Sequence, residues 1–347
     1  MKIKNLNEIE VKKWIKFCDN NNNAWIEHRG ITFIKENNYS FCVFSGEEII
    51  AICPFIIEKI KYEKKYNVST MFGMSHPSPV IADHITGKKQ VKKLKRLIYS
   101  NIDKLALNHN ISKVTLNFLP TLYNKNSLTD IVNELNYHDY LVDVNSKIIL
   151  LDLNIDIKDQ WSMLSKGHRS EIKKHIDTVT LKYKSSKNMS KTFKDFKLSI
   201  KPIIELPDRK ELFLFELYKI DLVDFIYVNQ GDNILGGGIF LKYGGISQYL
   251  HSKRFLKNDL PIHHLLLWLT IKKYKEQNQK ILDLGVFSYN THQRYILTDK
   301  KKNIALFKRG FGGAIKAFPI GEKYFSKDYF NDELSIRKSN YIEKISI

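Results

Sequence analysis

The stretch between Ile281 and Gly313, which begins ILDLGVF and ends KKKNIALFKRGFGG, is the most informative part of this sequence. A strand-like apolar run ends at Asp283 and a glycine, a polar loop follows, and a second strand-like run, Ile304–Phe307, leads to Lys308 and Arg309. Three glycines follow within four positions. Glycine lacks the Cβ atom that would hold a ligand away from the backbone. Two cations beside such backbone predict a site for a phosphate or a developing oxyanion.

Length and composition indicate a folded protein of two domains. The chain has 347 residues, of which 43% are hydrophobic, with 20 Phe and 18 Tyr. This length suits two domains of about 100 to 200 residues each, and the composition excludes a disordered chain. The start, MKIKNLNEIEVKKW, lacks an apolar signal-peptide core, and the longest apolar runs fall short of the roughly 20 residues of a membrane span. We predict a cytoplasmic protein without an integral membrane segment.

The cysteine and histidine patterns argue against a metal site. Cys18, Cys42 and Cys53 are odd in number and show no C-x-x-C spacing, so we expect buried free thiols rather than a disulfide framework or a zinc ribbon. His263 and His264 are adjacent on a predicted helix and therefore point apart.

The chain is strongly basic. Its 56 Lys and Arg against 37 Asp and Glu give a formal net charge of +19. Such a surface attracts polyanions, so nucleic acid, a phosphate-rich donor, and peripheral contact with an anionic membrane are all physically reasonable. The alternative is that the many lysines are solvated and reflect a composition rich in Lys, Asn and Ile.

Helix and strand patterns alternate in each half of the chain, which predicts two α/β (α+β) units of one topology. The elements expected in the first half are 11–18, 39–44, 49–57, 88–108, 113–118, 128–135 and 146–153. Those of the second half are 157–176, 179–183, 209–220, 223–229, 234–242, 246–252, 261–276 and 281–284. We expect domains at 1–150 and 151–330 with a cleft between them, followed by a tail at 331–347.

Several pieces of the second half resemble a known family. WSMLSKGHRSEIKKHI, ISQYLHSKR, LPIHHLLLWLTIKKYKEQNQKILDLGVF and KKNIALFKRGFGG, which lie within Trp161–Gly313, are similar to the Fem-like (FemABX-related) transferases. These are a branch of the GNAT superfamily with two tandem GNAT-type domains. Across residues 1–150 the likeness rests on element order and on FGMSHPSPVI. The resemblance implies two tandem GNAT-like domains.

The resemblance also implies an activity. Fem-like enzymes transfer an activated acyl group to an amine, with aminoacyl-tRNA as donor in some members and acyl-CoA as a further possibility. In the members that use aminoacyl-tRNA, a lysine just after a phenylalanine near the end of the second domain binds the aminoacyl donor and stabilises the tetrahedral intermediate. Phe307 and Lys308 match that pair, so Phe307 is a candidate substrate-binding residue and Lys308 a candidate catalytic residue.

The donor-binding region departs from acetyl-CoA-binding GNAT domains. The segment SKRFLKNDLPIHHLL has no glycine-rich turn before its helix, so backbone amides are not expected to cradle a CoA pyrophosphate. Lys253, Arg254 and Lys257 are predicted to neutralise donor phosphates instead, beside the positive end of the helix dipole.

Five further residues are candidates from their positions. Lys166 and Arg169 share one predicted helical face, where they can meet one anion or simply be solvated. Tyr249 and His251 alternate along a strand, and we expect both to face the cleft, although a packed tyrosine is the common alternative. Asp283 can accept a proton or a hydrogen bond from the acceptor amine.

We therefore predict an N-acyltransferase or aminoacyltransferase of the GNAT superfamily. The acceptor amine would attack the activated carbonyl directly, because no serine or cysteine lies in a nucleophile motif such as G-x-S-x-G. The acceptor would belong to a cell-envelope precursor, an amino sugar or a peptide, with acyl-CoA or aminoacyl-tRNA as co-substrate and no tightly bound cofactor. The alternative is a non-catalytic nucleic-acid-binding protein on a GNAT-like scaffold.

Overall fold

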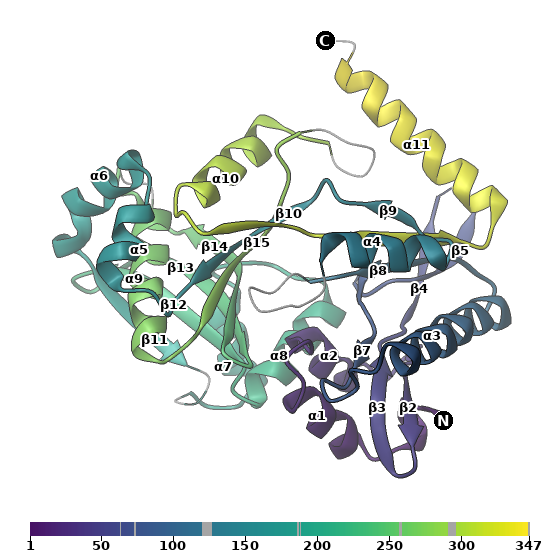
Figure 1. The fold of residues 1–347 in the computed structure, drawn as a ribbon. Coiled ribbons are helices and arrows are strands. Elements are labelled where there is room, and N and C mark those ends of the chain that lie inside the picture. The colour runs from purple at the N-terminus through teal and green to yellow at the C-terminus, as the bar shows by residue number, and fades with distance from the viewer. Residues whose placement is uncertain are drawn as a thin grey trace. The chain divides into compact units, whose positions relative to one another are not determined.

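The computed structural model describes residues 1–62, 64–72, 74–119, 127–185, 187, 189–256, 259–290 and 296–345. The chain forms two compact units (Figure 1). Unit 1 comprises Met1–Lys147, Ser288–Thr298 and Ala317–Ile347, and unit 2 comprises Ile148–Phe287 and Asp299–Lys316. The chain therefore passes from unit 1 to unit 2 and back more than once.

Unit 1 contains two sheets and five described α-helices. One sheet has the strand order β1 (Lys2–Asn5), β2 (Phe41–Ser45), β3 (Glu48–Cys53) and β7 (Val80–Ile81). The other has the order β4 (Ile57–Lys61), β5 (Lys65–Ser69), β8 (Ile111–Asn117), β17 (Ile320–Tyr324) and β9 (Leu141–Asp143), with β6 (His76–Pro77) beside β8. The helices are α1 (Val11–Asp19), α2 (Ile26–Gly30), α3 (Lys88–Asn108), α4 (Leu128–Tyr137) and α11 (Lys327–Ile345), with 3-10 turns at Leu6–Glu8 and Ile31–Phe33.

The two faces of β8 separate the apolar core of unit 1 from a buried polar layer. Val114 and Leu116 pack in one core cluster with Leu94 and Ile98 of α3. Lys113, which points the other way because side chains alternate along a strand, contacts carboxylates of β17 and α11. The last helix is thereby attached to the sheet of the first unit.

Unit 2 is built around one mixed sheet. Its strand order is β11 (Thr180–Ser185), β12 (Val223–Gln230), β13 (Asn233–Tyr243), β14 (Ile246–Arg254), β15 (Ile281–Phe287), β10 (Lys147–Asp152) and β16 (Ala314–Ala317). The helices are α5 (Ile157–Met163), α6 (Lys166–His175), α7 (Phe193–Ile200), α8 (Asp208–Lys219), α9 (Ile262–Glu276) and α10 (Asp299–Arg309), with a 3-10 turn at Ile176–Thr178.

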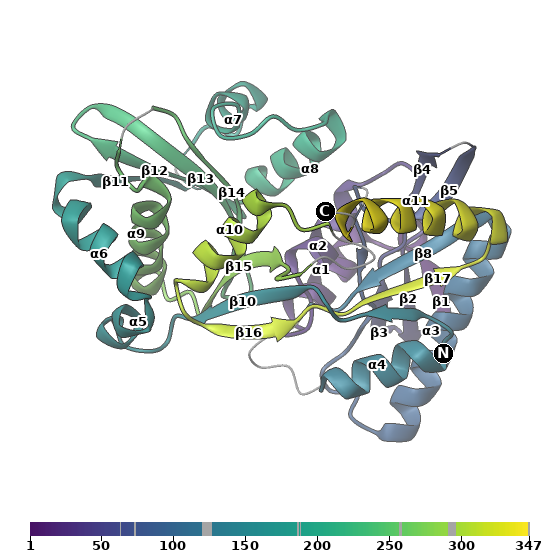
Figure 2. The ribbon, with the colours of Figure 1, turned by 90° about the horizontal axis from the view of Figure 1, so that it is seen from above.

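Helices cover both faces of the unit 2 sheet (Figure 2). Helix α9 packs on β12, β13 and β14, and α6 packs on α9. On the opposite face, Phe225 of β12 contacts the rings of Phe196 in α7 and Tyr218 in α8. Helix α9 packs closely on the sheet at Gly236 of β13, where a Cβ atom would lie 2.7 Å from Ile262 Cγ2.

One predicted strand and one predicted helix differ from the structure. The run Ile304–Phe307 is not a strand but part of α10, in which the buried residues Ala305 and Lys308 have helical i, i+3 spacing while Ile304 and Leu306 are exposed. The predicted helix 157–176 is divided into α5 and α6, because Ser165 Oγ accepts a hydrogen bond from the amide of His168 and begins a new helix.

The end of the chain also lies elsewhere than expected. Residues 317–330, which we predicted to close the second domain, lie in unit 1 because β17 pairs with β8. The predicted tail 331–347 continues helix α11 up to Ile345.

Candidate active site

The candidate site lies where two parallel strands stop pairing. Strands β14 and β15 are paired at only three positions, the last being Gln248 with Asp283. Both strands continue, β14 to Arg254 and β15 to Phe287. In α/β sheets, ligands commonly bind beyond the carboxyl ends of parallel strands. Asp283 and Gly285, the polar residue and the glycine of ILDLGVF, lie at the end of this paired segment.

Asp283 is a fully buried carboxyl group with an incomplete set of partners. Its Oδ1 accepts a hydrogen bond of 2.6 Å from the amide of Gly285. Within the described part of the chain, its Oδ2 has no hydrogen-bond partner. Burial raises the pKa of Asp283 to about 6, although the Gly285 amide, Lys308 and Gln248 oppose this shift. Asp283 is therefore an ionisable group that titrates close to neutral pH.

Lys308 reaches the same place from the last turn of α10. Its side chain is buried, and Nζ donates to the carbonyl oxygen of Val286 over 3.3 Å. Burial lowers the pKa of Lys308, and the carboxylate of Asp283 partly offsets this effect. The sequence alone predicted neither the contact with β15 nor the burial.

Gly285 makes room for the ammonium group. Its φ of +81° lies in the region that residues with a side chain rarely adopt. A Cβ atom at this position would lie 3.3 Å from Lys308 Nζ and 3.6 Å from the carbonyl oxygen of Tyr249. Lys308 thus occupies space beside the strand that any larger residue would restrict.

His168 of α6 holds the end of α10 in place. Its Nε2 donates to the carbonyl oxygen of Phe307 over 2.9 Å, and its Nδ1 accepts from Ser165 Oγ over 3.0 Å. Burial lowers the pKa of His168, which favours the neutral ring that these two bonds require. Phe307 packs on this ring and on His264, with ring centroids 5.4 Å and 4.9 Å away. Sequence patterns did not single out His168, although it lies between the candidates Lys166 and Arg169.

The three glycines after Lys308 do not leave open space for a ligand. A Cβ atom on Gly310 would lie 2.2 Å from the ring of His168. Those on Gly312 and Gly313 would lie 2.8 Å from Met163 and 2.5 Å from Leu151. These glycines are therefore explained by close packing against neighbouring residues of the protein. We had expected them to let a ligand come close to the backbone.

Tyr249 and His251 face opposite sides of the sheet. Tyr249 pairs with Phe240 and His251 with Ile239, so β14 has an extra residue, Leu250, in a bulge. The Tyr249 hydroxyl contacts Ser252 Oγ, which in turn lies 2.8 Å from His263 Nδ1 on α9. Burial raises the pKa of Tyr249. The expectation that both residues look into one site is wrong, because the bulge breaks the two-residue period.

His251 is on the α8 side of the sheet. Burial lowers its pKa, and the nearby cations Lys253 and Lys210 lower it further. Its side chain lies on the face opposite to that of Tyr249, because their partners Ile239 and Phe240 are adjacent on β13.

The predicted cations are mostly at the surface. Lys166 is exposed, and Arg169 donates to the carbonyl oxygen of Ser162 at the end of α5 over 2.8 Å. Lys253 is exposed, and Arg254 donates to Leu260 O over 2.8 Å just before α9. Lys257, the third predicted phosphate ligand, lies outside the described residues.

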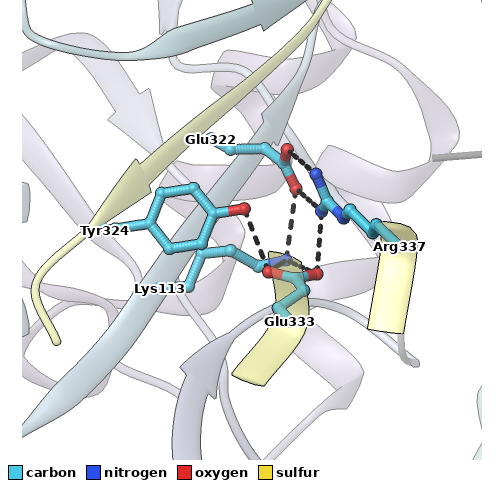
Figure 3. A network of polar contacts seen from close by, with 5 residues as sticks. All are labelled: Lys113, Glu322, Tyr324, Glu333 and Arg337. Atoms are coloured by element: carbon cyan, nitrogen blue, oxygen red, sulfur yellow. Dashed lines mark hydrogen bonds and ion pairs between the residues drawn. The ribbon is translucent and has the colours of Figure 1, made fainter. Parts of the chain in front are cut away.

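Unit 1 contains a second buried lysine in a different environment (Figure 3). Lys113 Nζ donates to Glu333 Oε1 and Oε2 over 2.7 and 2.9 Å, and to Glu322 Oε1 over 3.2 Å. Arg337 donates to both glutamates over 2.7–2.9 Å, and Tyr324 donates to Glu333 over 3.0 Å. We call these five residues the α11 network.

Unit 1 also has a cavity of about 600 Å³. Its lining combines apolar side chains with polar ones, among them His28, Asp83, Asn117 and Glu134. In the part of the chain that is described, Asn117 Oδ1 has no hydrogen-bond partner. A pocket of this size and mixed lining suits a small molecule.

Two further properties bear on function. Among the residues that the structure describes, no group of His, Cys, Asp and Glu side chains is arranged to hold a metal ion. None of the described helices combines the length and apolar character that crossing a bilayer requires.

The chain has a tandem GNAT-type fold of Fem-like architecture, as its likeness to solved structures shows. A FemX crystal structure is similar over 95% of this chain and 99% of its own, with a TM-score of 0.68 and 10% identity. The L-PGS of Bacillus licheniformis matches over 94% and 96%, with a TM-score of 0.58 and 11% identity. A tandem GNAT protein of clavulanic acid biosynthesis matches over 93% and 98%, with a TM-score of 0.53 and 9% identity. No family model and no curated protein matches the sequence.

Proposed function

We propose that this protein is an N-acyltransferase that moves an activated acyl or aminoacyl group onto an amine. The observation that carries the proposal is the buried Lys308 ammonium beside Asp283, at the end of the β14–β15 ladder in a Fem-like tandem GNAT fold. Perturbed ionisable groups of this kind are typical of functional sites.

The proposed reaction is a direct acyl transfer. The amine nitrogen attacks the carbonyl carbon of the donor, a C–N bond forms, and the electron pair of the carbonyl moves to its oxygen. Lys308 stabilises this oxyanion, which is more negative than the carbonyl before it. The intermediate then collapses: the carbonyl double bond forms again, and the bond to the ribose oxygen of a tRNA or to the sulfur of CoA breaks. The leaving group takes up the proton that the amine has lost.

Asp283 is proposed to assist the amine. A carboxyl group with a pKa of about 6 is mostly ionised at neutral pH, and its unpartnered Oδ2 can accept a hydrogen bond or the proton that the amine loses. A base whose pKa lies near the working pH is effective in such a step. Phe307 is proposed to line the donor site through its packing on His168 and His264.

The substrates are proposed as classes. Acyl-CoA is supported by the tandem GNAT neighbour, a structure solved without AcCoA. An aminoacyl group is supported by a further similar structure, the C-terminal domain of a putative lysylphosphatidylglycerol synthetase of Agrobacterium fabrum. Lys253 and Arg254 are proposed to contact donor phosphates, and Lys166 and Arg169 are proposed to bind an anionic part of the substrate. The acceptor is proposed to be an amine of a cell-envelope precursor, an amino sugar or a peptide.

A single-turnover assay tests the proposal. The protein is mixed with aminoacyl-tRNA or acyl-CoA and a panel of amines, and loss of the donor ester or thioester is followed. We expect loss that depends on an amine and is much slower in Lys308→Met. Tight RNA binding that is equal in both proteins, with no donor consumed, would instead favour a nucleic-acid-binding protein, since one phosphate contact among many changes affinity little.

A further inference from the structure

Helix α3 of unit 1 carries an exposed basic face. Lys89, Lys92, Lys93 and Arg96 follow the spacing i, i+3, i+4, i+7, so they lie on one side of the helix, and all four are exposed. The opposite side, with Leu94, packs in the core. We call the four cations the α3 patch.

The cations of the α3 patch are not neutralised by ion pairs with other described residues. Among the described residues, none of the four cations forms an ion pair, whereas Lys95 of the same helix pairs with Glu134. The sequence contains no Asp or Glu between residues 88 and 102. Cations in the first turns of a helix are also opposed by its dipole. Helix stability therefore does not explain the patch.

An exposed tyrosine lies within the patch. Tyr137, the last residue of α4, is 59% exposed. Lys92 Nζ and Arg96 Cζ each lie 5.8 Å from the centre of its ring, and Arg96 donates to its hydroxyl over 2.8 Å. The patch thus combines clustered cations with one exposed aromatic ring.

We propose that the α3 patch binds the surface of a membrane that contains anionic phospholipid, with Tyr137 at the level of the head groups. Clustered Lys and Arg are attracted to anionic lipids. Tyrosine is enriched at membrane–water interfaces, where its amphipathic ring lies at the level of the head groups. RNA is the other polyanion that the charges would attract, but the Tyr137 ring, on which a base would stack, is already in contact with Lys92 and Arg96. The proposal does not depend on the acyltransferase reaction.

Vesicle sedimentation with the full-length protein tests this inference. We would compare vesicles of phosphatidylcholine with vesicles that also contain phosphatidylglycerol, at low and high salt. Lys89, Lys92 and Lys93 are replaced together by Gln, which keeps helix propensity. The matched control replaces Lys12, Lys13 and Lys16, three exposed lysines on α1 of the same unit, in the same way. Both variants lower the net charge equally, and their melting temperatures show whether they are folded.

We expect the wild type to bind only the anionic vesicles, and more weakly as salt rises. The α3 variant should lose about 100-fold in affinity, as about 5-fold for each cation near an anionic surface implies, and the α1 variant far less. Tyr137→Ser should weaken the binding that remains at high salt. Equal losses in the two lysine variants, or no binding of the wild type to anionic vesicles, would overturn the proposal. Binding of tRNA that displaces the vesicle-bound protein and needs the α3 patch would assign the surface to RNA instead.

Discussion

Two buried lysines, one in each unit, have opposite kinds of surroundings. Lys113 in unit 1 has two glutamates within 2.7–3.2 Å and the rings of Tyr324 and Tyr329 within 5.6 Å. Lys308 in unit 2 has one hydrogen bond, a 3.3 Å contact with a backbone carbonyl. Within the described residues it forms no ion pair, and Asp283 acts on it from a greater distance.

This difference leads us to expect a structural role for Lys113 and a chemical role for Lys308. A buried ion that is fully paired contributes little net stability, but removing one partner leaves the others uncompensated. A buried ion that is poorly paired costs stability and is retained where function needs it. Lys113 should therefore matter for stability, and Lys308 for activity.

The largest expected effect is on the stability of unit 1. Lys113→Met removes a buried cation that contacts both Glu322 and Glu333, so the free energy of unfolding should fall by about 3–5 kcal/mol. Urea denaturation of the wild type and the variant measures this change in the free energy of unfolding. Lys64→Met is the control, since Lys64 pairs with Asp328 at 68% exposure on both sides and should change stability by less than about 0.5 kcal/mol. Equal changes would show that the α11 network is not strongly coupled.

The next effect is on catalysis in unit 2. Lys308→Met should lower kcat by about 100-fold or more, equivalent to about 2.7 kcal/mol, the typical cost of losing one oxyanion stabiliser. Stability should be unchanged or higher, because a poorly paired buried charge is removed. Lys308→Arg should restore activity only in part, since its planar group places charge differently. Arg309→Met, at the exposed neighbour, is the control for kcat.

Asp283→Asn should make the protein more stable and less active. Because the folded-state pKa of Asp283 is raised from 3.8 to about 6, wild-type stability decreases as pH rises through this interval, and the full cost of the buried carboxylate is present above it. The variant should gain about 1 to 2 kcal/mol at neutral pH and nothing near pH 4, because the loss of support for Lys308 offsets part of the shift.

Denaturation at several pH values measures the Asp283→Asn difference. In the wild type, kcat/KM should fall as pH drops below about 6, and the variant should lack this dependence while being slower throughout. A stability difference that stays constant from acid to neutral pH would contradict the assigned pKa.

The sequence predicts most of the elements of the fold but only part of the site. Helix α3 begins and ends where its apolar stripe indicates, at Lys88 and Asn108. A short apolar run such as Ile304–Phe307 can be a strand or a helix. It is helical here, and the buried side of the helix carries Lys308 as well as Ala305. Hydrophobic patterns do not reveal this side, because they place lysines at the surface.

The site itself depends on contacts between distant segments. Lys308 and Asp283 could be named from the sequence, but their meeting depends on Gly285 and on how α10 returns to β15. The sequence did not predict a role for His168. Its ring packs against Gly310, where a Cβ atom would leave no room, and Gly310 is 142 positions further along the chain. No local sequence pattern shows such a contact. The bulge at Leu250, which turns His251 away, is likewise a property of strand pairing.

The smallest expected effect separates backbone strain from the position of the ammonium. Gly285→Ala places a Cβ atom 3.3 Å from Lys308 Nζ at a φ of +81°, whereas Gly231→Ala creates similar strain at +56° with nothing within 4 Å. Both should lose about 1 kcal/mol of stability, the usual cost of a side chain at positive φ. Only Gly285→Ala should also displace the ammonium, and a shift of this kind should reduce kcat by about 10-fold. Comparing kcat with the urea midpoint in both variants tests this. If the two alanine variants were equally active, the space beside Gly285 would not control where Lys308 places its charge.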